Sequence, residues 1–277
     1  MTTPNLSIIG HKLDPSVYEY SEKDVILYAL GVGCGREDLR FLYENDLKVL
    51  PTFAVVPAFP ALFSIGAAVD VSPMMILHGE QRIEICAPIP TSARLTTTPV
   101  ITGIYDKVKG ALVIIETETV DADGRLLFRN VFGAFARGAG GFGGDRGPST
   151  ARHAAPDRKP DRVTEMKTRL EQALLYRLSG DRNPLHADPA FAKMGGFDTP
   201  ILHGLCTFGY VGRAILAEFC ENDPARFKDF EARFVGVVYP GETIVTEMWR
   251  EDGRVLVRAR TKERGELVIH NAAATVA

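Results

Sequence analysis

The sequence predicts an α+β fold built as two tandem copies of one unit, each an antiparallel sheet wrapped around a central helix. Helix-like segments followed by a β-rich block occur twice along the 277 residues. The stretch Tyr28-Ala29-Leu30-Gly31 aligns with Tyr176-Arg177-Leu178-Ser179 at an offset of 148. The β-rich blocks alternate polar residues with Val, Ile, Leu and Thr, which is typical of strands with one buried face. Such internal repetition indicates a duplicated architecture.

The first copy begins with a helix-like segment over residues 16–30. Ser21 stands three residues before Asp24, which is the spacing of a capping box at a helix start. Residues 25–30 supply an apolar face, and the Gly-rich stretch 31–35 ends it. We therefore expect a helix followed by a loop.

The same plan recurs in the second copy. Thr168 stands three residues before Glu171, and Gly180 provides the breaker. The apolar face between them consists of Leu174, Leu175 and Leu178. A longer apolar run over residues 205–219 predicts a further helix.

A β-rich block follows in each copy, over residues 94–136 and 243–276. Asp-Gly-Arg and Lys-Gly steps in these blocks favour tight turns between antiparallel strands. Each copy then consists of helix, loop, helix and a meander of three or four strands, which is the hotdog arrangement. The expected organisation is a double hotdog: a first copy over residues 1–137, a Gly/Pro-rich linker over 138–163 and a second copy over 164–277.

The composition of the chain excludes several classes of protein. The apolar fraction of 45% and the charged fraction of 24% are those of a globular protein. A formal charge of -3 excludes a basic nucleic-acid-binding surface, and no apolar run approaches a membrane span. The four scattered cysteines indicate a reducing compartment. The N-terminus lacks a secretory pattern and the C-terminus is no peroxisomal tripeptide, so we expect a cytoplasmic protein.

Most of the chemistry lies in one stretch, residues 178–204, LSGDRNPLHADPAFAKMGGFDTPILHG. Its turn-forming composition places Asp181 and His186 on a loop between two periodic segments. Gly204 stands where the run 205–219 begins, so its N–H is expected among the unpaired groups of a helix start. An acid/base pair followed by an oxyanion donor suits chemistry beside a carbonyl.

The motif Gly-Asp-x-Asn-Pro-Leu-His-x-Asp-Pro, followed by Pro-Ile-Leu-His-Gly, resembles the R-specific enoyl-CoA hydratase 2 and MaoC-like dehydratase family. Residues 77–81, 137–144 and 239–243 are also similar to members with two hotdog units. The resemblance therefore covers nearly the whole chain.

The resemblance implies an enzyme of fatty-acid metabolism, including β-oxidation. It would add water reversibly to trans-2-enoyl-CoA and give (3R)-3-hydroxyacyl-CoA, with no metal or redox cofactor. Asp181 and His186 match the catalytic pair that holds the water, Asn183 would orient that pair, and Gly204 matches the oxyanion donor. An acyl-CoA substrate and a homodimer are the implied partners, with neither nucleic acid nor membrane.

The residues around Gly204 are candidates for the acyl pocket. The expected substrate-binding residues are His203, Leu205, Phe208 and Gly209, although a role in the core or in structure is an alternative for each. By resemblance, the first copy has lost catalytic residues and accommodates the acyl chain.

The repeat gives its own evidence on the number of active sites. With the offset of 148, the position of Asp181 falls on Gly33 and that of His186 on Asp38. The position of Gly204 falls near Val55 or Val56. The first copy lacks the acid/base pair, so we expect one active site per chain, in the second copy.

Each of these residues also has a structural interpretation. Asp181 could cap a turn, His186 could be an ordinary hydrogen-bonded histidine, and Asp188 is expected to cap the next helical turn, with Pro189 first in it. His78 is expected to pack beside a strand that begins near Gln81. A metal site of Asp181, His186 and Asp188 is disfavoured because no third histidine stands at ligand spacing.

Three other functions share these sequence features. A dehydratase of another pathway would run the same reaction in reverse on a 3-hydroxyacyl thioester. A hotdog protein that binds acyl-CoA without turnover would lack the intact catalytic set. A hotdog thioesterase would release free CoA thiol, which a hydratase does not.

Overall fold

One antiparallel sheet of ten strands organises the computed structural model, which describes residues 3–147 and 153–277. The strands are β1 (Ser16–Tyr20), β2 (Ile76–Ile85), β3 (Ala93–Asp106), β4 (Gly110–Val120), β5 (Leu126–Arg137), β6 (Arg162–Lys167), β7 (Phe227–Phe234), β8 (Thr243–Glu251), β9 (Arg254–Thr261) and β10 (Leu267–Val276). Their order in the sheet is β1-β3-β4-β5-β2-β7-β10-β9-β8-β6. Each half of the chain thus contributes five neighbouring strands, and β2 pairs with β7 where the halves meet. The expected duplicated antiparallel unit is confirmed.

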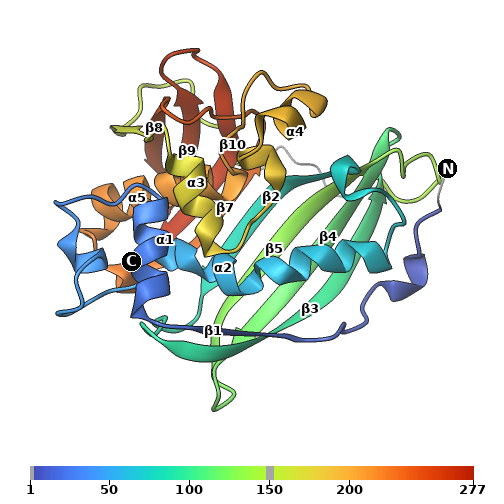
Figure 1. Cartoon of the computed structure of the whole chain (residues 1–277), viewed down its shortest axis with the longest axis horizontal. Helices are drawn as coiled ribbons and strands as arrows, with labels where there is room; N and C mark the ends of the chain where they lie inside the picture. Colours follow the sequence, from blue (N-terminus) through green and yellow to red (C-terminus); the bar gives the residue numbers. More distant parts are fainter. Residues whose placement is uncertain (1–2, 148–152) are drawn as a thin grey trace.

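Helices cover one face of this curved sheet (Figure 1). The α-helices among the described residues are α1 (Glu22–Gly31), α2 (Val55–Ala58), α3 (Gln172–Tyr176), α4 (Pro189–Met194) and α5 (Gly204–Cys220). The 3-10 helices are η1 (Leu6–Ile8), η2 (Leu39–Phe41), η3 (Pro51–Ala54), η4 (Phe59–Ala67), η5 (Pro73–Met75), η6 (Arg177–Ser179), η7 (Pro184–His186) and η8 (Pro224–Arg226). Within these described segments, no helix is both long enough and apolar enough to cross a membrane.

The central helix of the second half is α5. Its residues are largely buried, and Phe208 stacks on Phe230 of β7 with ring centroids 4.3 Å apart. Apolar residues nearly all round are expected for a helix enclosed by a sheet. The helix predicted over residues 205–219 is confirmed, with one more residue at each end.

The central helix of the first half is broken. The segments η3, α2 and η4 run in succession along the strands β3 to β5 (Figure 1). Pro57 and Pro60 lie within this run, and proline removes a backbone donor from the helical hydrogen-bond ladder. The run still buries Ala61 and Ile65 in a second core cluster with Ile115 and Phe132.

The segment predicted as a helix over residues 16–30 is a strand followed by a helix. Residues 16–20 form β1, which pairs with β3, and α1 begins only after Ser21. The capping box is confirmed, since the Asp24 carboxylate accepts the Ser21 N–H at 2.9 Å. The apolar residues before Ser21 fit the two-residue period of a strand, which the prediction of a helix did not take into account.

The prediction that Thr168 caps the next helix is wrong. Its hydroxyl instead donates to the carbonyl oxygen of Glu242 at 2.8 Å, and Glu171 occupies the cap position without a side-chain bond. The expected apolar face is also wrong, because Leu174 and Leu178 are 51% and 44% exposed. The buried positions of α3 are Gln172, Ala173 and Tyr176.

The two halves share one core. The Gln172 side-chain amide donates to the carbonyl oxygen of Gly31 at 2.6 Å, joining α3 to α1. Gly209 of α5 lies so close to α1 that a Cβ there would be 2.4 Å from a methyl carbon of Val32. Glycine is needed at this crossing because nothing larger fits. The main core cluster accordingly contains residues of both halves.

Residues 138–147 follow the sheet closely after β5 ends. The Asp106 carboxylate accepts the N–H groups of Gly141 and Gly143 at 2.9 and 2.8 Å. These bonds, led by the one from Gly141, lower the pKa of Asp106. The start of the expected linker is therefore anchored to β3, and the next strand begins at Arg162.

Candidate active site

A short turn holds Asp181 and His186 in a fixed relation. The Asn183 N–H donates to the Asp181 carboxylate at 3.1 Å, while the Asn183 side-chain oxygen accepts the Leu185 N–H at 3.0 Å. The second bond caps η7, the turn that ends in His186. Asn183 thus ties both residues together, an arrangement that suits the orienting role expected of it.

The His186 ring is buried and held in one tautomer. Its Nδ1 lies 2.8 Å from the carbonyl oxygen of Ile201, so Nδ1–H donates and Nε2 keeps a lone pair. Burial lowers the pKa of His186, and the Asp181 charge opposes this with a smaller effect. The ring is therefore neutral near pH 7, with a basic nitrogen free for a water molecule.

His203 completes a group of three with Asp181 and His186. Its Nε2 donates to the backbone carbonyl of Asp181 at 3.2 Å, and its ring stacks on His186 with centroids 3.7 Å apart. One ligand atom from each of the three residues lies within 4.8 Å of the others. We expected His203 among the residues that bind the substrate, but sequence spacing did not predict its place beside Asp181 and His186.

Asp188 lies outside this group. Its carboxylate caps α4 by accepting the N–H groups of Ala190 and Phe191, with Pro189 first in the helix. The expected capping role is confirmed.

Gly204 begins α5 and is exposed, whereas the next eight residues are buried. The first N–H groups of a helix lack intrahelical acceptors, and the helix dipole makes that end favourable for negative charge. Gly204 follows His203, which contacts Asp181, so the start of α5 borders the acid/base group. The role of the Gly204 N–H as an oxyanion donor stays a prediction.

The other expected substrate-binding residues pack inside the core. Leu205 and Phe208 are 4% and 0% exposed, and Gly209 lies against Val32. Contact of these three residues with an acyl chain stays a prediction.

His78 lies on the first-half side of the site. It is within β2, which begins at Ile76, so the strand start expected near Gln81 is wrong. The ring packs edge-on against Phe234, the side chain that a Cβ at Gly204 would meet, and also contacts Phe132. Burial lowers the pKa of His78 to about 4. The expected packing role is confirmed, and the contacts place first-half residues at the border of the site.

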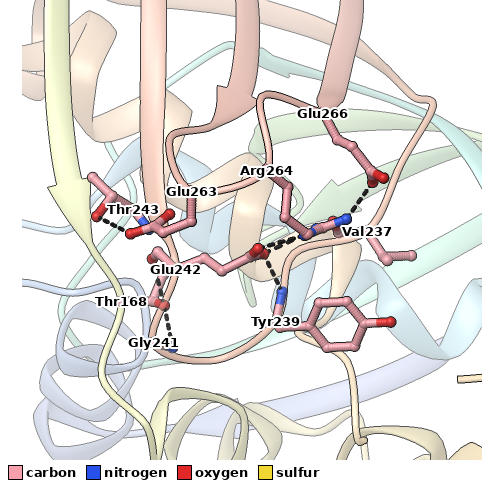
Figure 2. Close-up of polar contacts among 9 residues, drawn as sticks. All are labelled: Thr168, Val237, Tyr239, Gly241, Glu242, Thr243, Glu263, Arg264 and Glu266. Carbon is pink, nitrogen blue, oxygen red and sulfur yellow. Dashed lines mark hydrogen bonds and ion pairs between the residues drawn. The ribbon is translucent and has the colours of Figure 1, made fainter. Parts of the chain in front are cut away.

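A polar network centred on Glu242 and Arg264 holds the loop that contains Val237 and Tyr239 (Figure 2). The Leu202 N–H donates to the carbonyl oxygen of Val238 at 2.8 Å. Arg264 donates to the carbonyl oxygen of Val237 at 2.6 Å and to the Glu242 carboxylate. Glu242 in turn accepts the Tyr239 N–H at 2.7 Å. Local sequence patterns contain no sign of this link, because Arg264 is more than 60 residues from Leu202.

Replacing Arg264 by alanine should destabilise the fold and disturb the site together. The side chain of Glu242 is 11% exposed and would keep its charge without its partner, at a cost of roughly 3 kcal/mol. Urea unfolding and turnover measure both effects. Lys228→Ala, a surface change on β7, is the matched control, and equal stability of the two variants would contradict this role.

The first-half positions equivalent to the site have structural roles. Asp38, which aligns with His186, accepts from Arg213 of α5 at 2.9 Å and from the Gly35 N–H at 2.8 Å. Gly33, which aligns with Asp181, has φ +85° and lies under the Tyr210 ring. Val55 and Val56, at or near the position of Gly204, are both buried at the start of α2. No acid/base pair stands at these positions.

Asp38→Asn should therefore weaken the fold and leave turnover intact. We expect a loss of roughly 1.5–3 kcal/mol, the range for a hydrogen bond to a charged group, because Arg213 loses its anionic partner. Chemical unfolding and turnover at saturating substrate check this. A large loss of turnover with unchanged stability would place chemistry in the first half.

The lowered histidine pKa values predict the pH dependence. Catalysis by neutral His186 should persist below pH 6.5, the ordinary histidine value, and decline only as pH falls through the lowered folded-state pKa. For stability, the unfolded chain binds protons more readily than the folded chain at His78, His186 and His203, so stability is lost as pH falls below 6.5. A pH profile of kcat/KM tests the first part. A midpoint above 6.5 would contradict it.

Both halves of the chain match known protein families. Residues 18–138 match the family described as MFE-2 hydratase 2 N-terminal domain, and residues 151–272 match the MaoC like domain. A Dictyostelium discoideum protein named probable enoyl-CoA hydratase 2 is 43% identical, over 100% of this chain and 97% of its own. The Mus musculus peroxisomal multifunctional enzyme type 2 is also 43% identical, over 98% of this chain but 38% of its own.

Solved structures resemble this chain over nearly its whole length. A MaoC-like dehydratase from Phytophthora capsici superposes with a TM-score of 0.89 at 37% identity, covering 99% of both chains. A Mycobacterium tuberculosis protein described as a double hotdog fold superposes with a TM-score of 0.60 at 17% identity, over 96% of this chain and 95% of its own. This second likeness concerns the fold alone and confirms the predicted double hotdog. Taken with the family matches, these likenesses show that the chain belongs to the hydratase 2 and MaoC-like dehydratase family, a family of hydro-lyases.

Proposed function

We propose that this chain is an R-specific enoyl-CoA hydratase, which adds water reversibly to trans-2-enoyl-CoA and gives (3R)-3-hydroxyacyl-CoA. One observation carries the proposal: the Asp181 carboxylate and the neutral His186 ring lie in one group with His203, the residue directly before Gly204 at the start of the buried helix α5. Relatives named enoyl-CoA hydratase 2 support it. The reverse reaction, dehydration of the 3-hydroxyacyl thioester, uses the same catalyst.

The geometry suggests a role in the hydration reaction for each of these residues. Asp181 and His186 Nε2 hold one water molecule, whose oxygen bonds to C3 of the enoyl group. One proton of that water is transferred to C2 on the same face, so the addition is syn. Meanwhile negative charge grows on the thioester oxygen, and the Gly204 N–H accommodates it. The Ile201 carbonyl keeps the basic nitrogen of His186 directed at the water.

The acyl chain is proposed to extend toward the first half. Gly204 is bordered by Phe234, whose ring meets His78 of β2, which in turn contacts Phe132 of β5. These contacts support a path from the thioester toward first-half side chains. His203, Leu205, Phe208 and Gly209 are proposed to shape its beginning.

The proposed reaction needs neither a metal nor a redox cofactor. Addition of water to a double bond already polarised by a thioester transfers no electrons to an acceptor, and an acid/base pair supplies the proton transfers. We further propose a homodimer, which sedimentation equilibrium tests. We also propose a cytoplasmic location. The mouse relative is named peroxisomal, so microscopy of the tagged chain is needed to test this proposal.

The direct test is the absorbance of the enoyl-thioester band with crotonyl-CoA and with a medium-chain trans-2-enoyl-CoA. Loss of the band without release of free CoA thiol, followed with a thiol reagent, is the expected result. Thiol release would instead show a thioesterase. A chain that binds either substrate without spectral change would be an acyl-CoA-binding protein.

A further inference from the structure

His203 is a buried histidine to which the proposed hydration assigns no proton. It is 1% exposed and directly precedes α5. Its Nδ1 is buried and has no hydrogen-bond partner among the residues that the structure describes. A buried polar atom without a partner costs free energy, and an apolar side chain would fill this space without that cost. Stability alone therefore does not explain a histidine at this position.

The other ring nitrogen of His203 holds the backbone of Asp181. Its Nε2–H donates to the Asp181 carbonyl oxygen at 3.2 Å, because a carbonyl can only accept. Asp181 lies on a partly exposed turn, where its carboxylate also accepts the Asn183 N–H at 3.1 Å. His203 is the N-cap residue of α5, a largely buried helix of 17 residues. The bond therefore fixes a loop residue to a rigid element.

The ring of His203 also supports His186. The two imidazoles stack with centroids 3.7 Å apart and an interplanar angle of 28°. Tyr176 of α3 packs against His203 with centroids 4.9 Å apart, and Tyr28 of α1 packs against Tyr176 at 6.1 Å. The Ile201 carbonyl holds one edge of the His186 ring, and the stack covers its face. The two contacts together restrict the tilt of the His186 ring.

We propose that His203 is a positioning residue for hydration, which holds Asp181 and the His186 ring in a fixed relation. It acts through two separate contacts, the Nε2–H bond to the Asp181 carbonyl oxygen and the stack on His186. It neither gives nor takes a proton. The rate depends steeply on such alignment, since a misplacement of about 1 Å can cost roughly 10²-fold. The effect on turnover rests on the proposed hydratase function, whereas the two contacts do not.

Two substitutions separate the two contacts. His203→Phe keeps an aromatic ring for the stack and loses the N–H that Asp181 accepts, whereas His203→Gln loses the ring and keeps an amide N–H. We expect kcat of His203→Phe to fall by roughly 10²-fold with KM nearly unchanged, because the substrate still binds but the water is misaligned. His203→Gln should recover part of this loss, because the Ile201 carbonyl still holds His186. Steady-state hydration of crotonyl-CoA and of a medium-chain enoyl-CoA measures both constants.

His11→Phe is the matched control, because His11 is an exposed histidine outside the site, and it should keep the kcat and KM of the parent. Urea unfolding shows whether each variant is folded. Equal kcat in His203→Phe and the parent would overturn the positioning role, and so would equal losses in His203→Phe and His203→Gln. A rise in KM that grows with acyl-chain length, at unchanged kcat, would assign His203 to the acyl path alone.

The ring tautomers test the contacts without any turnover and need only the parent and His203→Gln. Nitrogen NMR of the chain labelled in its histidine rings should show the proton on Nε2 of His203 and on Nδ1 of His186. The signal that is missing in His203→Gln identifies His203. A proton on Nδ1 of His203 would overturn the bond to Asp181, even in an active hydratase. The expected tautomers in a chain that hydrates no enoyl-CoA would refute the proposed function and leave the contacts intact.

Discussion

Asp181→Asn should reduce kcat by roughly 10²–10⁴-fold, the usual contribution of a general acid or base. The substitution is nearly isosteric, and the asparagine oxygen can still accept the Asn183 N–H that shapes the turn. The negative charge that holds and activates the water is lost, so the chemical step suffers more than substrate binding. Steady-state hydration of crotonyl-CoA gives kcat and KM separately.

Asp188→Asn is the matched control for this change. It lies in the same motif, but its carboxylate caps α4 and does not enter the group around His186. Asparagine is an equally good cap, so turnover and stability should both stay near the parent values. Equal effects of the two substitutions would refute the assignment of Asp181.

Gly204→Pro should reduce kcat by roughly 10²–10³-fold, the measured range for loss of one oxyanion donor. Proline removes the N–H that we assign to the thioester oxygen. The helix tolerates the change, because Gly204 is the first residue of α5, where proline is favourable. The preceding residue, His203, already has the extended backbone that proline requires, with φ -60° and ψ 137°.

Gly204→Ala separates the lost N–H from added bulk. Alanine keeps the N–H, and its Cβ would lie 3.5 Å from the Phe234 ring, an ordinary van der Waals contact. Turnover of this variant should exceed that of the proline variant by at least an order of magnitude. If both variants lost the same activity, the effect would be steric and the oxyanion role would be wrong.

Local patterns predicted much of the fold. The capping box at Ser21, the cap at Asp188 and the long helix after His203 are each encoded within a few residues, and all three are present. The predictions that were wrong concern segments whose structure depends on contacts with residues far away in the sequence. Thr168 bonds to Glu242 across the sheet edge in place of capping a helix. The strand β1 depends on pairing with β3, whose sequence lies about eighty residues away.

The same distinction applies to the site. Asp181, Asn183 and His186 lie within one short motif, so the sequence could place them together. The tautomer of His186 depends on the carbonyl oxygen of Ile201, and the third member of the group, His203, arrives from the start of another helix. The support from Arg264 required the folded arrangement of β8, β9 and β10, which no local spacing contains.

The most direct test of the central claim is the stereochemical configuration of the 3-hydroxyacyl-CoA product. The enzyme is mixed with a trans-2-enoyl-CoA, and the product is offered in parallel to R-specific and S-specific 3-hydroxyacyl-CoA dehydrogenases. The proposal predicts NADH formation only with the R-specific enzyme, retained in Asp38→Asn and lost in Asp181→Asn. Formation of the S product, or R product at an undiminished rate in Asp181→Asn, would contradict it.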